Sequence, residues 1–166
     1  MKGRLLTSLL AMVVLSGLQA QETPVVPRLV VGITIDQLRM DYVEAFSALY
    51  GERGFKRLLK EGRTYQHLEY DFVDVDKSSS VASIYSGTTP YNHGIVGDMW
   101  LDRNTLRMVN CVDDANFMGV YTSESTSPVR LKVSNLVDEL MVATQGMAET
   151  YSIAPTREMA VLSAGH

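Results

Sequence analysis

Residues 29–36 read LVVGITID and residues 76–87 read DKSSSVASIYSG, and together these two stretches decide the fold class. The first is a nearly continuous apolar run that ends in an acid, which is typical of a strand buried in a parallel sheet. The second predicts a hydroxyl-rich turn and a short helix that Gly87 closes. Ligands of open α/β sheets collect beyond the carboxyl ends of the strands, where helix N-termini favour anions. We therefore expect Asp36 to face the start of the serine-bearing helix across a shared anion pocket.

The amino terminus has the pattern of an exported protein. Lys2 and Arg4 precede an apolar run over residues 5–15, and small residues follow up to Ala20. This pattern predicts a cleaved secretory signal peptide over residues 1–20 and an extended leader over residues 21–28. The run is shorter than the roughly 20 apolar residues that a bilayer span requires, so no membrane span is expected after signal removal. We expect a periplasmic or otherwise exported protein, cleaved near Ala20.

The net charge bears on the partners that the chain could bind, and the cysteine content bears on disulfides. Removal of residues 1–20 takes away Lys2 and Arg4 and no acid, so the net charge changes from −4 to −6. A surface that binds nucleic-acid polymers is not expected from this balance. Cys111 is the only cysteine, which excludes an internal disulfide.

Strand and helix patterns alternate over residues 29–166, which predicts a doubly wound α/β domain with a mostly parallel sheet flanked by helices. Besides the serine helix, helices are expected over residues 41–50, 55–60 and from a Ser134 cap to Gly146. Strands are expected at residues 29–35, 105–111, 150–153 and 159–163, and polar loops at residues 88–105 and 113–128. Because the last residues, AVLSAGH, look like a strand entering a functional turn, we expect a truncated amino-terminal part of a longer domain.

Each candidate for chemistry also has a purely structural interpretation. Asp36 suits a metal ligand, but it equally suits a helix cap. The hydroxyls of residues 78–80 suit a helix cap or a nucleophile, and Lys77 suits an anion contact or an ion pair with Asp76, Asp74 or Asp36. The three histidines are too widely spaced to form a metal cluster by themselves: His67, His93 and His166.

Four segments, taken in order, carry a resemblance to a known superfamily: VVGITIDQLRMDYV, GFKRLLKEGRTYQ, ASIYSGTTPYNHGIVGDMWLDR and AVLSAGH. They resemble the amino-terminal part of the alkaline phosphatase superfamily, in particular exported bacterial phosphatases and the type I phosphodiesterase and nucleotide pyrophosphatase group. The resemblance implies an alkaline phosphatase-like α/β fold, hydrolysis of small anionic phosphoric esters, two zinc ions, and a Thr or Ser nucleophile at a helix start. It places most metal ligands beyond His166.

The resemblance transfers unevenly onto the site. The first-strand Asp of the superfamily is a metal ligand, and this role falls on Asp36. The nucleophilic Thr falls on Lys77, with Ser78 one position away. The Asn that contacts phosphate falls on Asp98, whose negative charge would repel a phosphoryl oxygen.

The Lys and Arg that precede the AGH turn in the phosphomonoesterase branch fall on Thr156 and Glu158, with Arg157 between them. Each such departure removes or reverses a charge that complements phosphate, at a cost on the order of 3 kcal/mol of transition-state stabilisation. A standard phosphomonoesterase is therefore disfavoured.

Two hypotheses stay open. In the first, Asp36 holds zinc, Ser78 or else Ser79 attacks phosphorus, and Lys77 with the helix N–H groups holds the oxyanion. Lys77, Asp98 and Arg157 are then the substrate-binding residues. In the second, Lys77 replaces the metal charge near Asp36, and the chain is a catalytically silent binding or envelope-assembly protein on the same scaffold.

Overall fold

The computed structural model describes residues 27–70, 72–73 and 76–166. The chain divides into two units, residues 1–31 and residues 32–166. The expected signal peptide and most of the expected leader lie outside the described residues. In the first unit, described residues 27–31 are exposed and form no helix or strand.

The apolar segment that was expected to be a buried parallel strand is extended but unpaired. Its large side chains, in residues 29–35, are 44–79% exposed. A parallel strand is stabilised by neighbouring strands, and the two strands within the described residues pair with each other instead. The parallel sheet is thus absent from the described part of the chain, and the prediction of a buried strand is wrong for this structure.

Two short helical segments follow in the second unit. The helix expected over residues 41–50 is divided into α2 (Met40–Ala45) and the 3-10 helix η1 (Ser47–Leu49). Helix α3 (Phe55–Glu61) ends at Gly62, as predicted. Only Val43 is buried in α2, and the rings of Tyr50 and Phe55 pack with their centroids 5.2 Å apart.

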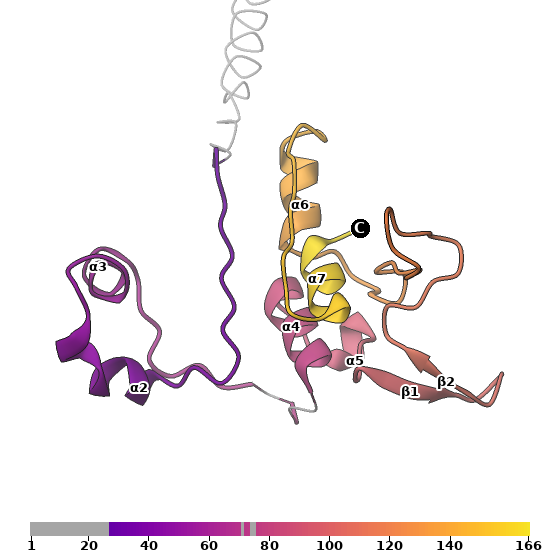
Figure 1. The fold of residues 1–166 in the computed structure, drawn as a ribbon, viewed down its shortest axis with the longest axis horizontal. Helices are drawn as coiled ribbons and strands as arrows, with labels where there is room; N and C mark the ends of the chain where they lie inside the picture. Colours follow the sequence, from indigo (N-terminus) through magenta and orange to yellow (C-terminus); the bar gives the residue numbers. More distant parts are fainter. Residues whose placement is uncertain (1–26, 71, 74–75) are drawn as a thin grey trace, which may run out of the picture. The chain divides into compact units, whose positions relative to one another are not determined.

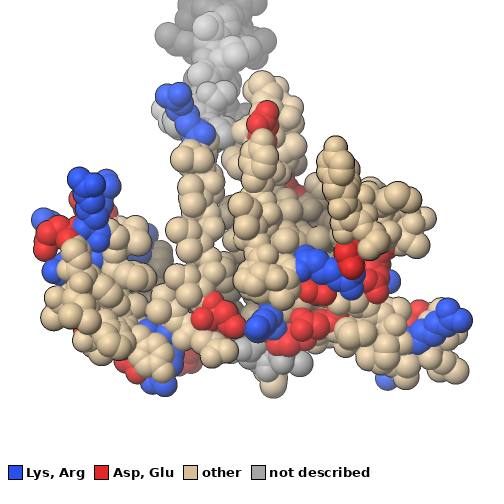
Figure 2. Space-filling model, in the orientation of Figure 1, with Lys and Arg blue, Asp and Glu red and all other residues tan. Residues whose placement is uncertain are grey.

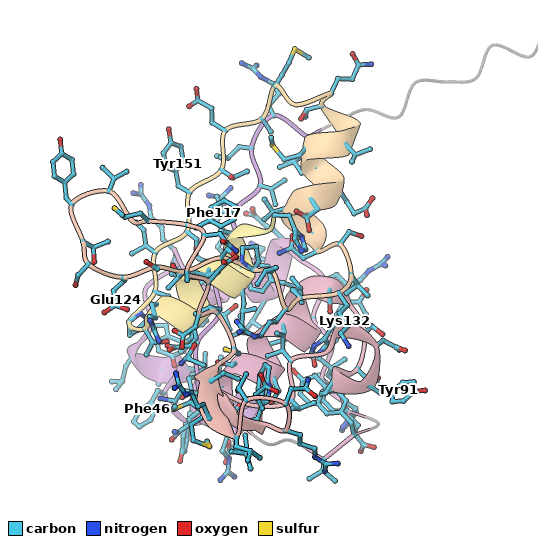
Figure 3. All side chains as sticks on the ribbon, turned by 90° about the vertical axis from the view of Figure 1, so that its right-hand side faces the viewer. Phe46, Tyr91, Phe117, Glu124, Lys132 and Tyr151 are labelled. Atoms are coloured by element: carbon cyan, nitrogen blue, oxygen red, sulfur yellow. The ribbon has the colours of Figure 1, made fainter. Side chains whose placement is uncertain are left out.

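The serine helix is confirmed as α4 (Lys77–Ser86). Asp76 caps its start, and Gly87 ends it with a φ of 67°, a left-handed conformation that glycine adopts without strain. The following segment is more ordered than the expected loop because Pro90 is placed at the first turn of α5 (Pro90–His93). In α5, Tyr91 points to solvent (Figure 3). His93, in the same helix, is buried.

A hairpin follows α5. Strands β1 (Met99–Asp102) and β2 (Arg107–Asn110) pair antiparallel, with Met99 opposite Asn110. Strand β2 falls within the strand predicted over residues 105–111, whereas β1 replaces part of the predicted loop. Residues 113–128 form an irregular polar segment, as predicted, with one isolated bridge between Asp113 and Thr126.

The end of the chain differs from four predictions. Helix α6 (Leu136–Ala143) is capped by Asn135 rather than Ser134, and it ends before Gly146. Residues 159–163, expected as a strand, belong to helix α7 (Arg157–Ala164), which Thr156 caps. Residues 150–153 form no strand. Short apolar runs do not distinguish a strand from a buried helix, and most residues of α7 are good helix formers.

The core lies around α4. This helix packs against α7, α5 and α6, and Figure 1 shows α4 and α7 side by side. The buried apolar cluster draws on α4, α7, the segment after α5, the end of the hairpin and the chain before α6: Val81, Ala82, Ile95, Cys111, Val112, Leu131 and Leu162. Among the described helices, none has the length and apolar character needed to cross a bilayer.

Candidate functional site

Asp36 lies beside the start of α4. Its Oδ2 is 3.8 Å from Nζ of Lys77, and both side chains are about half exposed. The chain before Asp36 also follows α4, since a Cβ added at Gly32 would come within 2.9 Å of the Tyr85 hydroxyl. Asp36, which ends the LVVGITID stretch, and Lys77, the first residue of the serine helix, therefore lie next to each other at a solvent-exposed position.

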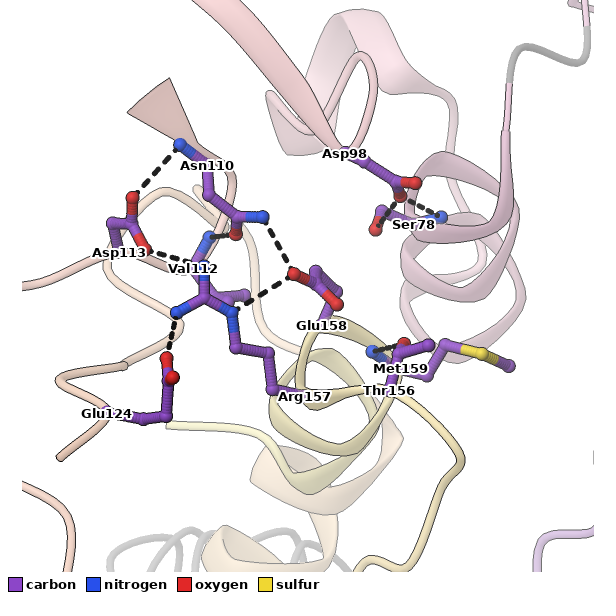
Figure 4. A network of polar contacts seen from close by, with 10 residues as sticks. All are labelled: Ser78, Asp98, Asn110, Val112, Asp113, Glu124, Thr156, Arg157, Glu158 and Met159. Carbon is purple, nitrogen blue, oxygen red and sulfur yellow. Dashed lines mark hydrogen bonds and ion pairs between the residues drawn. The ribbon is translucent and has the colours of Figure 1, made fainter. Parts of the chain in front are cut away.

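Ser78 is held by Asp98 at the same end of α4. The Ser78 backbone N–H donates to Asp98 Oδ1 over 3.3 Å, and its hydroxyl donates to the same oxygen. Ser78 has no exposed surface, whereas Asp98 is exposed. Figure 4 shows the Asp98 carboxylate directed at the first turn of the helix. The backbone N–H and the hydroxyl of Ser78 are therefore already hydrogen-bonded to a carboxylate of the chain itself.

Asp76 is the second carboxylate at this helix start. Its Oδ1 accepts the Ser79 backbone N–H over 3.0 Å, and its own N–H donates to the Ser79 hydroxyl, which forms a capping box. Its Oδ2 accepts the backbone N–H of Asp98. Ser79 is thus engaged in helix capping, and Asp76 connects α4 to the beginning of β1.

Arg157 is surrounded by carboxylates. Its guanidinium donates to Asp113 over 2.9 Å, to Glu158 over 3.1 Å and to Glu124 (Figure 4). Burial disfavours its charge, but the hydrogen bond to Glu158 and the charges of Asp113 and Glu124 more than compensate, so the pKa of Arg157 is raised. Figure 2 shows the same pairing of signs at the surface, where blue groups in the central part of the view have red neighbours.

The two positions that flank Arg157 have structural partners. Thr156 accepts the Met159 backbone N–H and caps α7. Glu158 accepts from the Asn110 side-chain amide over 2.7 Å and from Arg157. Burial alone would raise the pKa of Glu158, but these hydrogen bonds lower it. Glu158 is therefore a carboxylate held in its charged form.

His93 and His166 have hydrogen-bond partners other than Asp36. His93 Nε2 is 2.9 Å from the Ser83 hydroxyl, and His93 Nδ1 accepts the Ile95 backbone N–H. Because the His93 ring is buried, its pKa is lowered. His166 contacts Asp138 over 2.9 Å, and that hydrogen bond raises the pKa of His166. His67 is exposed.

Cys111 is buried in the core next to the site. Desolvation raises the pKa of its thiol to about 11, so the thiol is neutral at ordinary pH. A neutral buried thiol is a poor nucleophile and a poor metal ligand. We therefore assign Cys111 to packing.

Among the described residues, Asp36 is the one that the sequence predicts as a metal ligand. Asp36 is exposed and its oxygens suit a zinc ion, but Lys77 already neutralises part of its charge. Within the described ranges, no group of three or more His, Cys, Asp or Glu side chains converges well enough to hold a metal ion. A complete zinc site is thus not formed by these residues alone.

The structure brings four predicted residues to one helix end: Asp36, Lys77, Ser78 and Asp98. Arg157 belongs to a separate carboxylate network. Sequence reasoning did not assign Asp76 as the cap, although an Asp three positions before Ser79 follows the capping-box spacing. Asn110, Asp113 and Glu124 were also missed, because their partners lie 33–48 residues away in sequence.

Comparison with known proteins extends these observations. Residues 30–157 match the family described as type I phosphodiesterase / nucleotide pyrophosphatase. Alkaline phosphatase PafA of Elizabethkingia meningoseptica is 35% identical over 165 residues, which covers 95% of this chain and 30% of PafA. Alkaline phosphatase PhoV of Synechococcus elongatus is 37% identical over 143 residues, which covers 84% of this chain and 26% of PhoV.

The fold comparison agrees with the sequence comparison. The crystal structure of wild-type PafA superimposes with a TM-score of 0.79 and 33% identity, and the match covers 84% of this chain and 28% of that chain. The architecture is therefore alkaline phosphatase-like α/β, although this chain spans less than a third of the length of these relatives. The family match over most of its length shows that the chain belongs to the type I phosphodiesterase / nucleotide pyrophosphatase family, within the alkaline phosphatase superfamily.

Proposed function

We propose that this chain is part of an exported hydrolase of phosphoric esters. The observation that carries the proposal is the meeting of Asp36 with the start of α4, where Lys77 Nζ is 3.8 Å from Asp36 Oδ2. An acid at the end of the leading segment and a helix N-terminus with hydroxyl groups are the two components that such a site requires. The relatives named as alkaline phosphatases support the same reaction class.

The charge distribution favours phosphodiesters over phosphomonoesters. A monoester is largely dianionic at neutral pH, whereas a diester carries a single negative charge. Asp98 lies at the start of α4, and Arg157 is already engaged by three carboxylates. These acids would repel the second charge of a monoester, so we assign a small phosphodiester as the substrate class.

The proposal gives each residue of the helix start a role. Ser78 is the nucleophile: its hydroxyl proton passes to Asp98 as Oγ bonds to phosphorus, and the bond from phosphorus to the leaving ester oxygen breaks. The leaving oxygen takes the proton from Asp98, and water then cleaves the bond between Oγ and phosphorus and restores the Ser78 hydroxyl. Because Ser78 is buried, the first turn of α4 must open toward the substrate before attack. Ser79 is the weaker candidate, since it completes the capping box with Asp76. Lys77 pairs with a phosphoryl oxygen, and Arg157 acts only if its carboxylate partners release it.

Zinc belongs to the proposal through Asp36. Two zinc ions are expected from the family, and Asp36 would bind one of them through its carboxylate. Bound zinc would neutralise charge that develops on phosphoryl oxygens. The remaining ligands are not among the described residues.

A second candidate function rests on the same contact. Lys77 occupies the position that the resemblance gives to a nucleophilic Thr, and its ammonium is close to Asp36. In this candidate, Lys77 replaces the charge of a metal ion, and the chain binds or scaffolds without turnover.

One experiment separates the two candidates. Zinc content and hydrolysis of bis(4-nitrophenyl) phosphate are measured for the full-length protein that contains this chain, as the wild type and as Ser78→Ala, Ser86→Ala and Lys77→Thr. Ser86 is the matched control, because its hydroxyl only donates to the Ala82 carbonyl at the other end of α4. The hydrolase predicts bound zinc and turnover that collapses by about 10³-fold or more in Ser78→Ala but not in Ser86→Ala. Absence of zinc and turnover in the wild type, with turnover gained in Lys77→Thr, would establish the silent candidate instead.

A further inference from the structure

The carboxylate of Asp76 contacts two separate segments of the chain. Oδ1 accepts the Ser79 backbone N–H, as a helix cap does, while Oδ2 accepts the backbone N–H of Asp98. The second contact spans 22 residues of sequence and is not part of helix capping. It joins the first turn of α4 to the residue that leads into β1.

The chain around Gly97 is shaped to admit this carboxylate. Gly97 is buried, and a Cβ added there would lie 3.1 Å from Asp76 Oδ2. That separation is tighter than ordinary van der Waals contact, so a larger residue would push the carboxylate away. A Cβ at position 97 would therefore shift the Asp76 carboxylate by a few tenths of an ångström at its contact with the Asp98 N–H.

The contact sets the position of Asp98 relative to Ser78. Asp98 is held through its backbone by Asp76, and its own carboxylate accepts both the N–H and the hydroxyl of Ser78. Asp76 is thus hydrogen-bonded to Asp98, and Asp98 is hydrogen-bonded to Ser78. Because Asp76 and Ser78 both lie at the start of α4, the backbone of that helix start completes the ring of contacts. Breaking the first link frees the second.

We propose that Asp76 is a positioning residue that holds Asp98 against Ser78, beyond its role as a helix cap. This inference rests on the proposed function insofar as Ser78 and Asp98 carry the reaction. It differs from a capping role in one respect that can be tested. Asn caps helices about as well as Asp, but its amide nitrogen would face the Asp98 N–H as a second donor.

The test is amide hydrogen exchange, measured residue by residue by NMR, in the wild-type chain and in Asp76→Asn. Asp102→Asn is the matched control, because Asp102 ends β1 and its carboxylate accepts local hydrogen bonds from Asn104 and Thr105 in the turn that follows. A positioning role predicts that the Asp98 and Ser78 amides exchange at least about tenfold faster in Asp76→Asn. The amides of residues 81–83, inside α4, and those of the control should be unchanged.

A second variant tests the inference in case Asp76→Asn does not fold. Gly97→Ala leaves both helix-cap atoms in place and should also speed exchange at Asp98. Unchanged Asp98 exchange in both variants, or equal acceleration along all of α4, would overturn the inference. Turnover of bis(4-nitrophenyl) phosphate is the second readout, with kcat expected to fall in Asp76→Asn while KM is retained. If the wild type shows no turnover, the proposed function fails, and exchange at Asp98 still decides the role of Asp76.

Discussion

Arg157 has the most charged environment of any side chain in the described polar network. Three carboxylates, from Asp113, Glu124 and Glu158, converge on its guanidinium, and its side chain is only 34% exposed. Replacing Arg157 by Met would leave these acids to repel one another. An arginine in this place therefore fixes the irregular segment after β2 onto α7.

We expect Arg157→Met to lower the free energy of unfolding by about 1–2 kcal/mol, because charge-assisted hydrogen bonds are lost at a partly exposed site. Urea denaturation measures the change. Arg57→Met is the control, since Arg57 forms an exposed pair with Glu61 one helical turn away, and it should cost less than about 0.5 kcal/mol. Equal losses in the two variants would contradict a special role for Arg157.

We expect the free energy of unfolding to fall in acid because of the buried side chain of His93. Burial lowers the pKa of His93 below its usual 6.5 in the folded chain, so the unfolded chain takes up this proton first as pH falls. The stability that neutral His93 contributes is complete above pH 6.5 and is lost as pH falls from 6.5 toward the folded pKa. His166 has a raised pKa and contributes the opposite trend.

A variant isolates the contribution of His93. In His93→Asn, the side-chain oxygen can still accept the Ile95 N–H, but the group no longer titrates. The drop in unfolding free energy between pH 7.5 and pH 5.5 should be smaller in this variant than in the wild type. Urea denaturation at the two pH values measures it, and identical drops in both proteins would refute the assignment.

Residue-level contacts could be predicted from the sequence where a general rule of the fold class brings two segments together. The pairing of Lys77 with Asp36 was one of three partners considered, because a strand-end acid and a helix start meet in α/β folds. The contact of Asp98 with Ser78 was not predicted, since 20 residues separate them and the chain between them includes α5. The charge of Asp98 was noted, but its partner was not.

At the scale of elements, the start of α6 shows how one residue replaces another as a cap. Asn135 is buried, accepts from the N–H groups of Val137 and Asp138, and donates to the Leu162 carbonyl in α7. Ser134, the cap expected from sequence, is exposed and donates to Glu139. Both residue types favour helix starts, so local preference could not choose between them.

We expect Asn135→Ala to destabilise the chain by about 2–3 kcal/mol, because a cap is lost and a buried carbonyl loses its donor. Ser134→Ala should change the unfolding free energy by no more than about 0.5 kcal/mol. Thermal or urea unfolding distinguishes the two variants. A larger loss in Ser134→Ala would show that the helix begins at the residue expected from the sequence.

Helices were predicted better than strands for a physical reason. The start and end of α4 and the end of α3 follow from local residues, namely Asp76, Gly87 and Gly62. The identity of residues 159–163 depends instead on burial, because Leu162 is enclosed by the packing of α7 against α4. An apolar run buried in this way has the same composition in a helix and in a strand.

At the scale of the whole molecule, the family could be recognised before the sheet could be placed. Ordered segments from residue 28 to His166 indicate an alkaline phosphatase-like α/β fold, and the TM-score of 0.79 to PafA agrees. The stretch over residues 29–35 nevertheless has no strand partner among the described residues. Pairing of a parallel strand depends on distant segments, which no local pattern encodes.

Asp36 and the start of α4 form one reactive site in the proposed function. The most direct test is a double-mutant cycle on kcat/KM for bis(4-nitrophenyl) phosphate with Asp36→Ala, Ser78→Ala and the double variant. Groups that act as a unit are strongly non-additive, so the account predicts that the double variant is no slower than the slower single variant. Losses that multiply, or single variants that keep wild-type turnover, would contradict it.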